Sequence, residues 1–419
     1  MIIVSLLFWL CVVAGVVALL VHLSGRHHRL QLKPDAIHFA TTEDGWRLTI
    51  SRYRARDSLG APPVVLCPGA GMGSVIFDVS EETSLARYLT SHGHDVWLLD
   101  LRGRPSRPRR RANWSFDDYV EFDIPAALRT ICEQSGSSQV QWVGFGVGAL
   151  VQLAALAGPE AGRVRSLLAL AAPVFFRRQQ ATIGPRLLRW LRLLRLDILA
   201  RLGAPLLGRL YPGPLKLLQN RDNVDGDTYR RALINALAGF SRAELLQYAE
   251  WLEHDSFTAT VQRRDYRASM GSIDTPTLFI VGPRDELAPP DMVEATANLL
   301  EEVEDRAVVV ASRMHGMSTN YGHLDLLLGR AVQRDIFTHI LKWLDLHAGV
   351  EIPGTRPEPP EPREGWSDEQ PYPRREPVSR EEPRELLEDE PLPAGLDEED
   401  EDDLDEDDLV QGDVPRVPG

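Results

Sequence analysis

The stretch that best indicates the fold is Val143-Gly144-Phe145-Gly146-Val147-Gly148, where an apolar run ends and a helical pattern begins. The residues just before it, 140–143, are apolar or aromatic apart from one glutamine, which is typical of a buried strand. The residues that follow, through Leu156, have the pattern of a helix. Glycine permits backbone conformations that other residues adopt only with strain. The sequence therefore predicts a strand–turn–helix unit with Gly146 at the centre of the turn.

Short apolar strands alternate with helical segments on both sides of this unit, from about residue 36 to residue 350. Such alternation predicts an α/β fold with a mostly parallel sheet and helices on both faces. Besides an opening hairpin over 37–39 and 47–50, the expected strands are 63–67, 95–100, 140–143, 166–171, 277–281 and 307–310. Helices are expected over 84–91, 117–133 and 324–346, and after the glycine turn.

Between residues 173 and 270 the strand pattern stops and helical patterns replace it. An insertion of this length between two strands commonly forms a cap over the carboxyl edge of the sheet, where ligands bind. Within it, Arg186–Leu202 has the pattern of a basic amphipathic helix, with leucines on one face and arginines on the other. Such a helix either packs its leucines on the body or lies in a bilayer interface.

The glycine turn has the spacing of the G-x-S-x-G nucleophile elbow. Three further motifs accompany it in the expected order: DVWLLDLRG at 95–103, WSFDDYVEFDIP at 114–125 and NYGHLDL at 320–326. On these motifs the chain resembles the α/β-hydrolase superfamily over roughly residues 36–348. It is most similar to the acid-lipase branch and its bacterial lipase- and esterase-like relatives. The resemblance implies an α/β-hydrolase fold with a helical cap.

The resemblance also implies a catalytic triad in the chain order nucleophile, acid, histidine. The acid position falls on Asp285, just past the strand 277–281, and the histidine position falls on His323. An imidazole oriented by a carboxylate serves as a general base. The nucleophile position falls on Gly146, which has no side-chain atom and cannot form an acyl-enzyme. The chain is therefore expected to lack serine hydrolysis, as a pseudoenzyme does.

The glycine-rich loop 68–73 departs from the family as well, because Pro68-Gly69 stands where the relatives have His-Gly. The backbone N–H groups of Ala70 and Val147 are still expected to converge on an oxyanion, since such a hole needs no side chain. Without a nucleophile, an oxyanion hole is a binding feature.

Three substitutes for the absent serine are open. Ser74 lies in the same loop and Cys67 ends the strand before it, but neither stands on the turn. The third is water activated directly by His323 and Asp285. Triads that lack one member retain roughly 10³–10⁴-fold rate over water, so residual activity alone would not demonstrate a selected function.

The two ends of the chain differ from the body. Residues 2–23 are apolar or small except Ser5 and His22, which predicts a single transmembrane anchor over residues 1–24. The alternative is a cleaved signal peptide, which is disfavoured because no Lys or Arg precedes the run and the run is longer than a typical signal-peptide core. The basic residues Arg26, Arg29 and Lys33 follow it, so the body is expected to face the cytoplasm. A body over 30–350 and a disordered, proline-rich acidic tail over 351–419 complete the predicted organisation.

Charge is distributed unevenly between body and tail. The tail holds 25 acidic and 7 basic residues, a net of −18, so the other 350 residues carry +3 of the total of −15. A body close to neutral gives no support for nucleic-acid binding. With three cysteines, one of them in the predicted anchor, a disulfide framework is not expected. No metal-ligand cluster and no cofactor motif is present in the sequence.

Three functions follow. The first is a membrane-anchored, lipase-like protein that has lost serine hydrolysis and binds a lipid or acyl ligand under its cap. The second is an active carboxylic-ester hydrolase with another nucleophile or activated water. The third is an interaction protein whose acidic tail binds a protein partner.

Overall fold

The computed structural model describes most of the predicted body. The described residues are 29–103, 113–176, 184–191, 220, 222–261 and 264–350, with Ser5, 8–13, 15–16 and 18–19 near the N-terminus. The predicted acidic tail, 351–419, and the part of the predicted amphipathic helix after residue 191 lie outside them.

The predicted anchor is described only in pieces. Its described residues are helical, and they expose apolar side chains such as Phe8, Trp9 and Leu10, which are 62 %, 61 % and 66 % exposed. Among the residues that the structure describes, no helix combines the length and the apolar character needed to cross a bilayer. The predicted transmembrane helix is therefore not confirmed.

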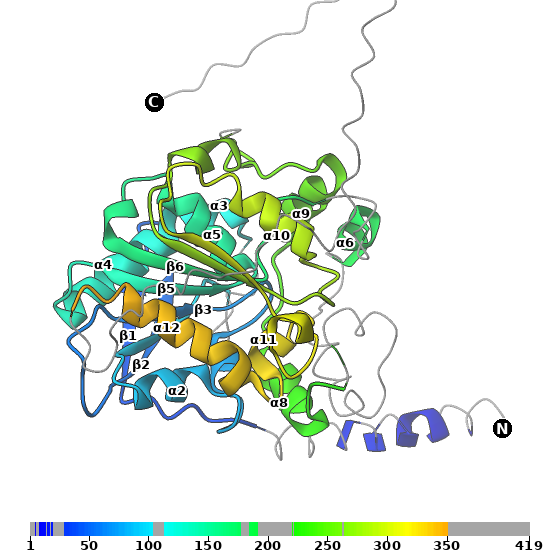
Figure 1. Ribbon diagram of the computed structural model, residues 1–419. Coiled ribbons are helices and arrows are strands. Elements are labelled where there is room, and N and C mark those ends of the chain that lie inside the picture. Colours follow the sequence, from blue (N-terminus) through cyan, green and yellow to red (C-terminus); the bar gives the residue numbers. More distant parts are fainter. Residues whose placement is uncertain are drawn as a thin grey trace, which may run out of the picture. The chain divides into compact units, whose positions relative to one another are not determined.

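The centre of the body is an eight-stranded sheet in the order β1-β2-β4-β3-β5-β6-β7-β8 (Figure 1). Six strands run parallel, and the β1–β2 hairpin joins β4 in antiparallel orientation. The predicted mostly parallel sheet is confirmed. The strands are β1 (Ala36–Thr41), β2 (Arg47–Tyr53), β3 (Val64–Cys67), β4 (Val96–Asp100), β5 (Val140–Phe145), β6 (Val164–Leu170), β7 (Thr277–Val281) and β8 (Arg306–Val310).

Helices cover both faces of the sheet, as Figure 1 shows. One face carries α2 (Leu85–Ser91) and α12 (Thr338–Leu346); the other carries α4 (Ile124–Ser135), α5 (Val147–Leu156) and α10 (Pro290–Ala297). Every residue of β3, β5 and β7 is buried. A parallel strand between two helical layers needs apolar side chains on both faces, which explains the continuous apolar runs in the sequence.

The remaining described helices are short or belong to the segment 173–270. They are α3 (Phe116–Asp118), α6 (Pro185–Leu191), α8 (Gly226–Ala236), α9 (Arg242–His254) and α11 (Asp325–Leu328). Single turns are η1 (Ser74–Phe77), η2 (Tyr119–Asp123), η3 (Ala161–Arg163), η5 (Ala268–Ser272), η6 (Arg313–His315) and η7 (Gln333–Phe337).

The helix predicted over 117–133 is confirmed as helical throughout, although it widens into the π-helical turn η2, next to Pro125 in the first turn of α4. Proline has no N–H to donate to the preceding turn, so regular α-helical bonding changes there without a break in the helix. The helix predicted over 324–346 is divided because Gly329 adopts an extended conformation and ends α11.

The segment 173–270, called the cap from here on, is fastened to the body by a buried carboxylate. Asp117 Oδ1 accepts hydrogen bonds from Gln247 Nε2 (2.7 Å) and Tyr266 Oη (3.0 Å), and its Oδ2 accepts one from the Thr260 N–H (2.7 Å). Asp117 lies in the WSFDDYVEFDIP motif. One function of that motif is therefore to hold the cap on the body.

Candidate active site

The turn after β5 has the conformation of a nucleophile elbow. Gly146 lies between β5 and α5 with φ +50° and ψ −117°, a region that favours glycine. Its N–H donates to the Leu170 carbonyl (2.8 Å), and its own carbonyl accepts from the Ala149 N–H (3.0 Å) and the Leu150 N–H (3.1 Å). The turn is thus fixed by bonds to β6 and to the first turn of α5.

The three glycines of the elbow differ in the space around them. A Cβ added to Gly144 would lie 2.4 Å from the Ala149 backbone, and one added to Gly148 would lie 2.2 Å from the Cys67 carbonyl oxygen. A Cβ on Gly146 would have its nearest neighbours at 3.9 and 4.0 Å, which is ordinary van der Waals contact. Packing therefore excludes side chains at the two flanking glycines and leaves room for one at the centre.

The structure brings the two other predicted triad residues together. His323 Nδ1 lies 2.7 Å from Asp285 Oδ2. Asp285 Oδ1 accepts from the Leu287 N–H (2.9 Å) and the Ala288 N–H (2.8 Å), and the carboxylate is fully buried. An ionised carboxylate only accepts, so the Nδ1–H of His323 donates to it and Nε2 is the ring nitrogen left for chemistry. The roles of acid and base stay predictions.

The His323 ring adjoins the elbow. It packs on the ring of Phe145, with 4.8 Å between ring centroids, and Phe145 is the residue before Gly146. The loop that carries His323 is held against the loop after β7, because the Arg284 N–H donates to the Tyr321 carbonyl (2.9 Å). The ends of β5 and β7 thus place the imidazole beside the turn.

The loop 68–73, called the oxyanion loop from here on, lies on the other side of the elbow. The Gly69 Cα is the atom 3.9 Å from the Cβ position of Gly146. No hydrogen bond joins the Ala70 N–H or the Val147 N–H to an acceptor among the described residues. Both N–H groups predicted for the oxyanion hole are therefore available to a ligand.

The cap closes over the oxyanion loop. The Gly73 N–H donates to the Ala236 carbonyl (2.6 Å), and the Ala238 N–H donates to the Gly71 carbonyl (2.8 Å). A Cβ on Gly71 would lie 2.5 Å from the ring of Phe240. Backbone pairing with residues 236–238 therefore fixes the loop, and an aromatic ring of the cap rests on it.

Sequence reasoning missed Asp325. Its buried carboxylate accepts hydrogen bonds from the Gly322 N–H (3.0 Å), from the Asn220 N–H (3.0 Å) and from Asn223 Nδ2 (3.3 Å). Burial raises the pKa of Asp325 to about 6, although these hydrogen bonds act in the opposite direction. The residue joins the loop of His323 to the cap. The only sequence signal was its place in the NYGHLDL motif.

The two substitute nucleophiles lie on the oxyanion-loop side of the site. Ser74 is 1 % exposed at the start of η1, where its N–H donates to Asp100 Oδ1 (2.6 Å). Cys67 is the last residue of β3 and is fully buried. Neither side chain replaces the elbow residue in the chain, and their chemical role stays an open prediction.

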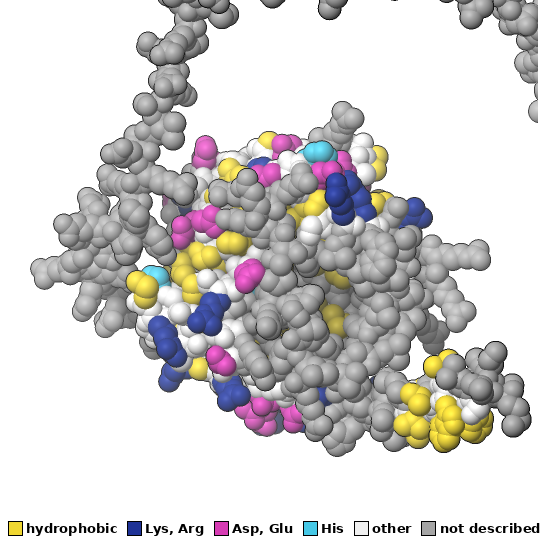
Figure 2. All heavy atoms as spheres, turned by 90° about the vertical axis from the view of Figure 1, so that its right-hand side faces the viewer, with side chains coloured by type: hydrophobic (Ala, Val, Ile, Leu, Met, Phe, Trp, Pro, Cys, Tyr) yellow, Lys and Arg dark blue, Asp and Glu magenta, His cyan; other side chains and the backbone are white. Residues whose placement is uncertain are grey.

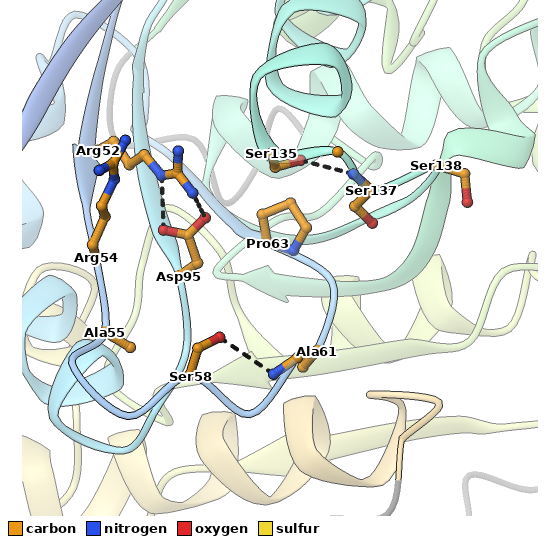
Figure 3. Close-up of a pocket in the computed structure, with 12 residues that line it drawn as sticks. Arg52, Arg54, Ala55, Ser58, Ala61, Pro63, Asp95, Ser135, Ser137 and Ser138 are labelled. Atoms are coloured by element: carbon orange, nitrogen blue, oxygen red, sulfur yellow. Dashed lines mark hydrogen bonds and ion pairs between the residues drawn. The ribbon is translucent and has the colours of Figure 1, made fainter.

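Other features of the described residues lie away from this site. A polar pocket of about 540 Å³ is located at the opposite edge of the sheet, where β3 and β4 begin, and Arg52 and Asp95 pair inside it (Figure 3). Among the described residues, no three His, Cys, Asp or Glu side chains are grouped to hold a metal ion. Figure 2 shows basic and acidic side chains interspersed on the described part of the face that it views.

The sheet order, the elbow and the His323–Asp285 pair define a class of protein. The family described as alpha/beta hydrolase fold matches residues 62–314, and the chain belongs to this family. Among solved structures, an esterase from Exiguobacterium antarcticum superposes with a TM-score of 0.50 at 15 % identity, covering 73 % of this chain and 98 % of that one. At this identity the likeness supports the fold alone.

Curated relatives narrow the class to lipase-like proteins. Triacylglycerol lipase 1 of Arabidopsis thaliana is 22 % identical in a match 344 residues long, which covers 73 % of this chain and 86 % of the relative. Lipase 1 of Drosophila melanogaster is 34 % identical over 122 residues, 27 % of each chain. Gastric triacylglycerol lipase of Homo sapiens is 30 % identical over 33 % of this chain and 39 % of its own length. The last two matches span about a third of their relatives.

Proposed function

We propose that this α/β-hydrolase-fold protein binds a lipid or acyl ligand beneath its cap and does not carry out serine hydrolysis. The observation that carries the proposal is Gly146 at the centre of an otherwise complete elbow. Acyl transfer by this fold needs an oxygen nucleophile at that position. We propose an acyl ligand because the curated relatives are named as lipases.

The surroundings of Gly146 support binding in place of catalysis. The N–H groups of Ala70 and Val147 have no acceptor among the described residues, and His323, paired with Asp285, packs on Phe145, the residue before Gly146. Such groups stabilise negative charge on an oxygen without taking part in bond formation. A site of this kind holds a carbonyl or carboxylate group and leaves it unchanged.

An active ester hydrolase is the second candidate, and the intact His323–Asp285 hydrogen bond favours it. In that case the imidazole removes a proton from water as the water oxygen adds to the ester carbonyl. The tetrahedral intermediate then breaks its bond to the alcohol oxygen, which takes the proton back from the imidazolium and leaves as the alcohol, so the acid forms without an acyl-enzyme and His323 is the base.

Attachment to a membrane is part of the proposal. Its support is the apolar run 2–23 and the exposed apolar side chains on the helical residues described there. An anchor would keep the cap close to lipid, where a hydrophobic ligand is concentrated.

The deciding experiment compares the purified full-length chain with Gly146→Ser and with Gly146→Ser/His323→Ala on p-nitrophenyl butyrate. We expect the parent to be inactive and Gly146→Ser to gain at least about 100-fold, because the serine completes a triad that acts as a unit. The double variant should lose that gain. Ser74→Ala in the Gly146→Ser background is the matched control and should keep it.

Two results would contradict the proposal. Hydrolysis by the parent that disappears on His323→Ala would establish the water-activating hydrolase. An inactive but folded Gly146→Ser protein would show that the site is not an intact hydrolase scaffold.

A further inference from the structure

We infer that the head group held at this site is a free carboxylate, so that the ligand is a fatty acid and not its ester. The inference rests on the proposed function and specifies its ligand. It follows from three features that meet at Gly146: two available N–H groups, room for an oxygen atom, and an imidazole that is backed by a buried carboxylate.

The first oxygen of a carboxylate fits the oxyanion hole. The Ala70 and Val147 N–H groups have no acceptor among the described residues. Hydrogen bonds from N–H groups to a charged oxygen are about twice as strong as those to a neutral carbonyl. This hole therefore favours an acid in its ionised form over the carbonyl of an ester.

The second oxygen fits where relatives carry the serine side chain. A Cβ on Gly146 would have no described atom nearer than Gly69 Cα at 3.9 Å and the Ala171 carbonyl oxygen at 4.0 Å, so the described residues leave room for one further atom at this position. In a chain with serine, the side chain occupies the place. The change to glycine thus exchanges a covalent nucleophile for space next to the oxyanion hole.

His323 supplies the proton that an acid requires. Its Nδ1–H donates to Asp285, so Nε2 faces away from that carboxylate. A protonated imidazole donates Nε2–H to a ligand carboxylate, and a neutral one accepts the O–H of the acid. Either way the pair shares one proton. An ester has no O–H to donate to a neutral imidazole, and its neutral carbonyl oxygen accepts from a protonated one more weakly than a carboxylate does.

Aromatic rings border the same loop. A Cβ on Gly69 would lie 3.0 Å from the Phe145 ring, and one on Gly71 would lie 2.5 Å from the Phe240 ring of the cap. Apolar rings on either side of the oxyanion loop exclude water and strengthen hydrogen bonds to a charged group. They are also suitable neighbours for an alkyl chain.

Calorimetric titration of the purified full-length chain, in one detergent, would test the inference with octanoate, methyl octanoate and 1-octanol. We expect octanoate to bind at least about tenfold more tightly than the ester, as loss of a charge-assisted hydrogen bond implies. His323→Ala should reduce the preference several-fold, because only the hydrogen bonds from Ala70 and Val147 then distinguish the acid from the ester. His315→Ala is the matched control, because His315 is exposed and bonds only to Ser312 locally, and it should keep the preference.

A second variant covers the case in which His323→Ala does not fold. Gly146→Ala retains the imidazole and places a methyl group in the volume assigned to the second oxygen, so it should weaken octanoate several-fold and methyl octanoate less. Equal binding of acid and ester, or an unchanged preference in folded His323→Ala, would overturn the inference and leave the proposed function standing. Failure of all three probes to bind would overturn both.

Discussion

At the scale of single residues, different physical constraints act on the three glycines of the elbow. Gly144 and Gly148 lie where the backbones of β5, α5 and β3 approach one another too closely for any side chain. A Cβ on Gly146 would be in ordinary van der Waals contact with its neighbours, but this glycine has a positive φ. At Gly144 and Gly148 a side chain would fit only if a strand or helix moved. At Gly146 a side chain fits, but a residue other than glycine would adopt the positive φ with backbone strain.

This difference predicts an order of stability. Gly148→Ala should lower the free energy of unfolding by about 3 kcal/mol or more, because its methyl group overlaps the Cys67 carbonyl oxygen. Gly146→Ala should cost about 1–2 kcal/mol of backbone strain. Denaturant unfolding of both variants measures the difference. Equal destabilisation by the two would contradict the packing argument.

Asp325 predicts a pH dependence. Burial raises its pKa to about 6 in the folded protein, whereas an exposed aspartate titrates near 4. The folded state therefore binds this proton more tightly than the unfolded state does. The contribution of Asp325 to the free energy of unfolding is then complete below about pH 4 and is lost as the pH rises through about 6. The loss amounts to up to about 3 kcal/mol.

The measurement is the free energy of unfolding at pH 4 and pH 7. Parent and Asp274→Asn, an exposed control, should lose this stability between the two values. Asp325→Asn should lose much less, although it is less stable at both because an amide cannot accept from all three donors around it. An identical pH slope in parent and Asp325→Asn would exclude the assignment.

Some residues of the site could be predicted from the sequence next to them, whereas others depend on contacts with residues far along the chain. His323 and Asp285 could be predicted from the local sequence: His323 lies in the NYGHLDL motif, and Asp285 comes just after the strand 277–281. The positioning contacts of Asp325 could not, because Asn220 and Asn223 approach it from more than 100 residues away. A local motif specifies a residue type, whereas partners across the fold depend on how the cap docks.

At the scale of elements, strands were easier to predict than helices. Runs such as Val64–Cys67 are buried on both faces, so composition alone marks them. Helix ends depend on single residues that act against periodicity. Gly329 interrupts a segment whose apolar spacing continues through the break, whereas Pro125 only accompanies a local π-helical widening. The spacing of apolar residues indicates which face of a helix is buried, whereas backbone hydrogen bonding determines where the helix ends.

The pairing between cap and oxyanion loop predicts a local change in dynamics. Ala238→Pro removes the N–H that bonds to the Gly71 carbonyl, so residues 68–73 should exchange their amide hydrogens about tenfold faster or more. Ala238→Gly keeps the N–H and should change little. Hydrogen-exchange mass spectrometry reports both, and unchanged protection over 68–73 in Ala238→Pro would show that the cap does not fix the loop.

At the scale of the whole molecule, the parallel sheet explains why distant segments meet. Gly146 and Asp285 follow β5 and β7, two strands with parallel neighbours, so both lie at the same edge. The family match over 62–314 agrees with this arrangement. The proposed membrane attachment rests on the apolar run 2–23 and does not follow from the sheet.

Attachment is testable on the intact protein. If residues 1–24 anchor the chain, full-length protein should remain in the membrane fraction after extraction with alkaline carbonate. A chain lacking residues 2–23 should be released. Extraction of the full-length protein by carbonate would show that its attachment, if any, is peripheral.

The packing around the elbow also bears on how this site changes over evolutionary time. Selection for a stable fold is sufficient to retain Gly144 and Gly148, whether or not any reaction is under selection. The turn and the room for a side chain at position 146 are therefore retained together with the fold itself. One amino-acid replacement at that position would place an oxygen in a turn whose shape is maintained by the packing of its neighbours.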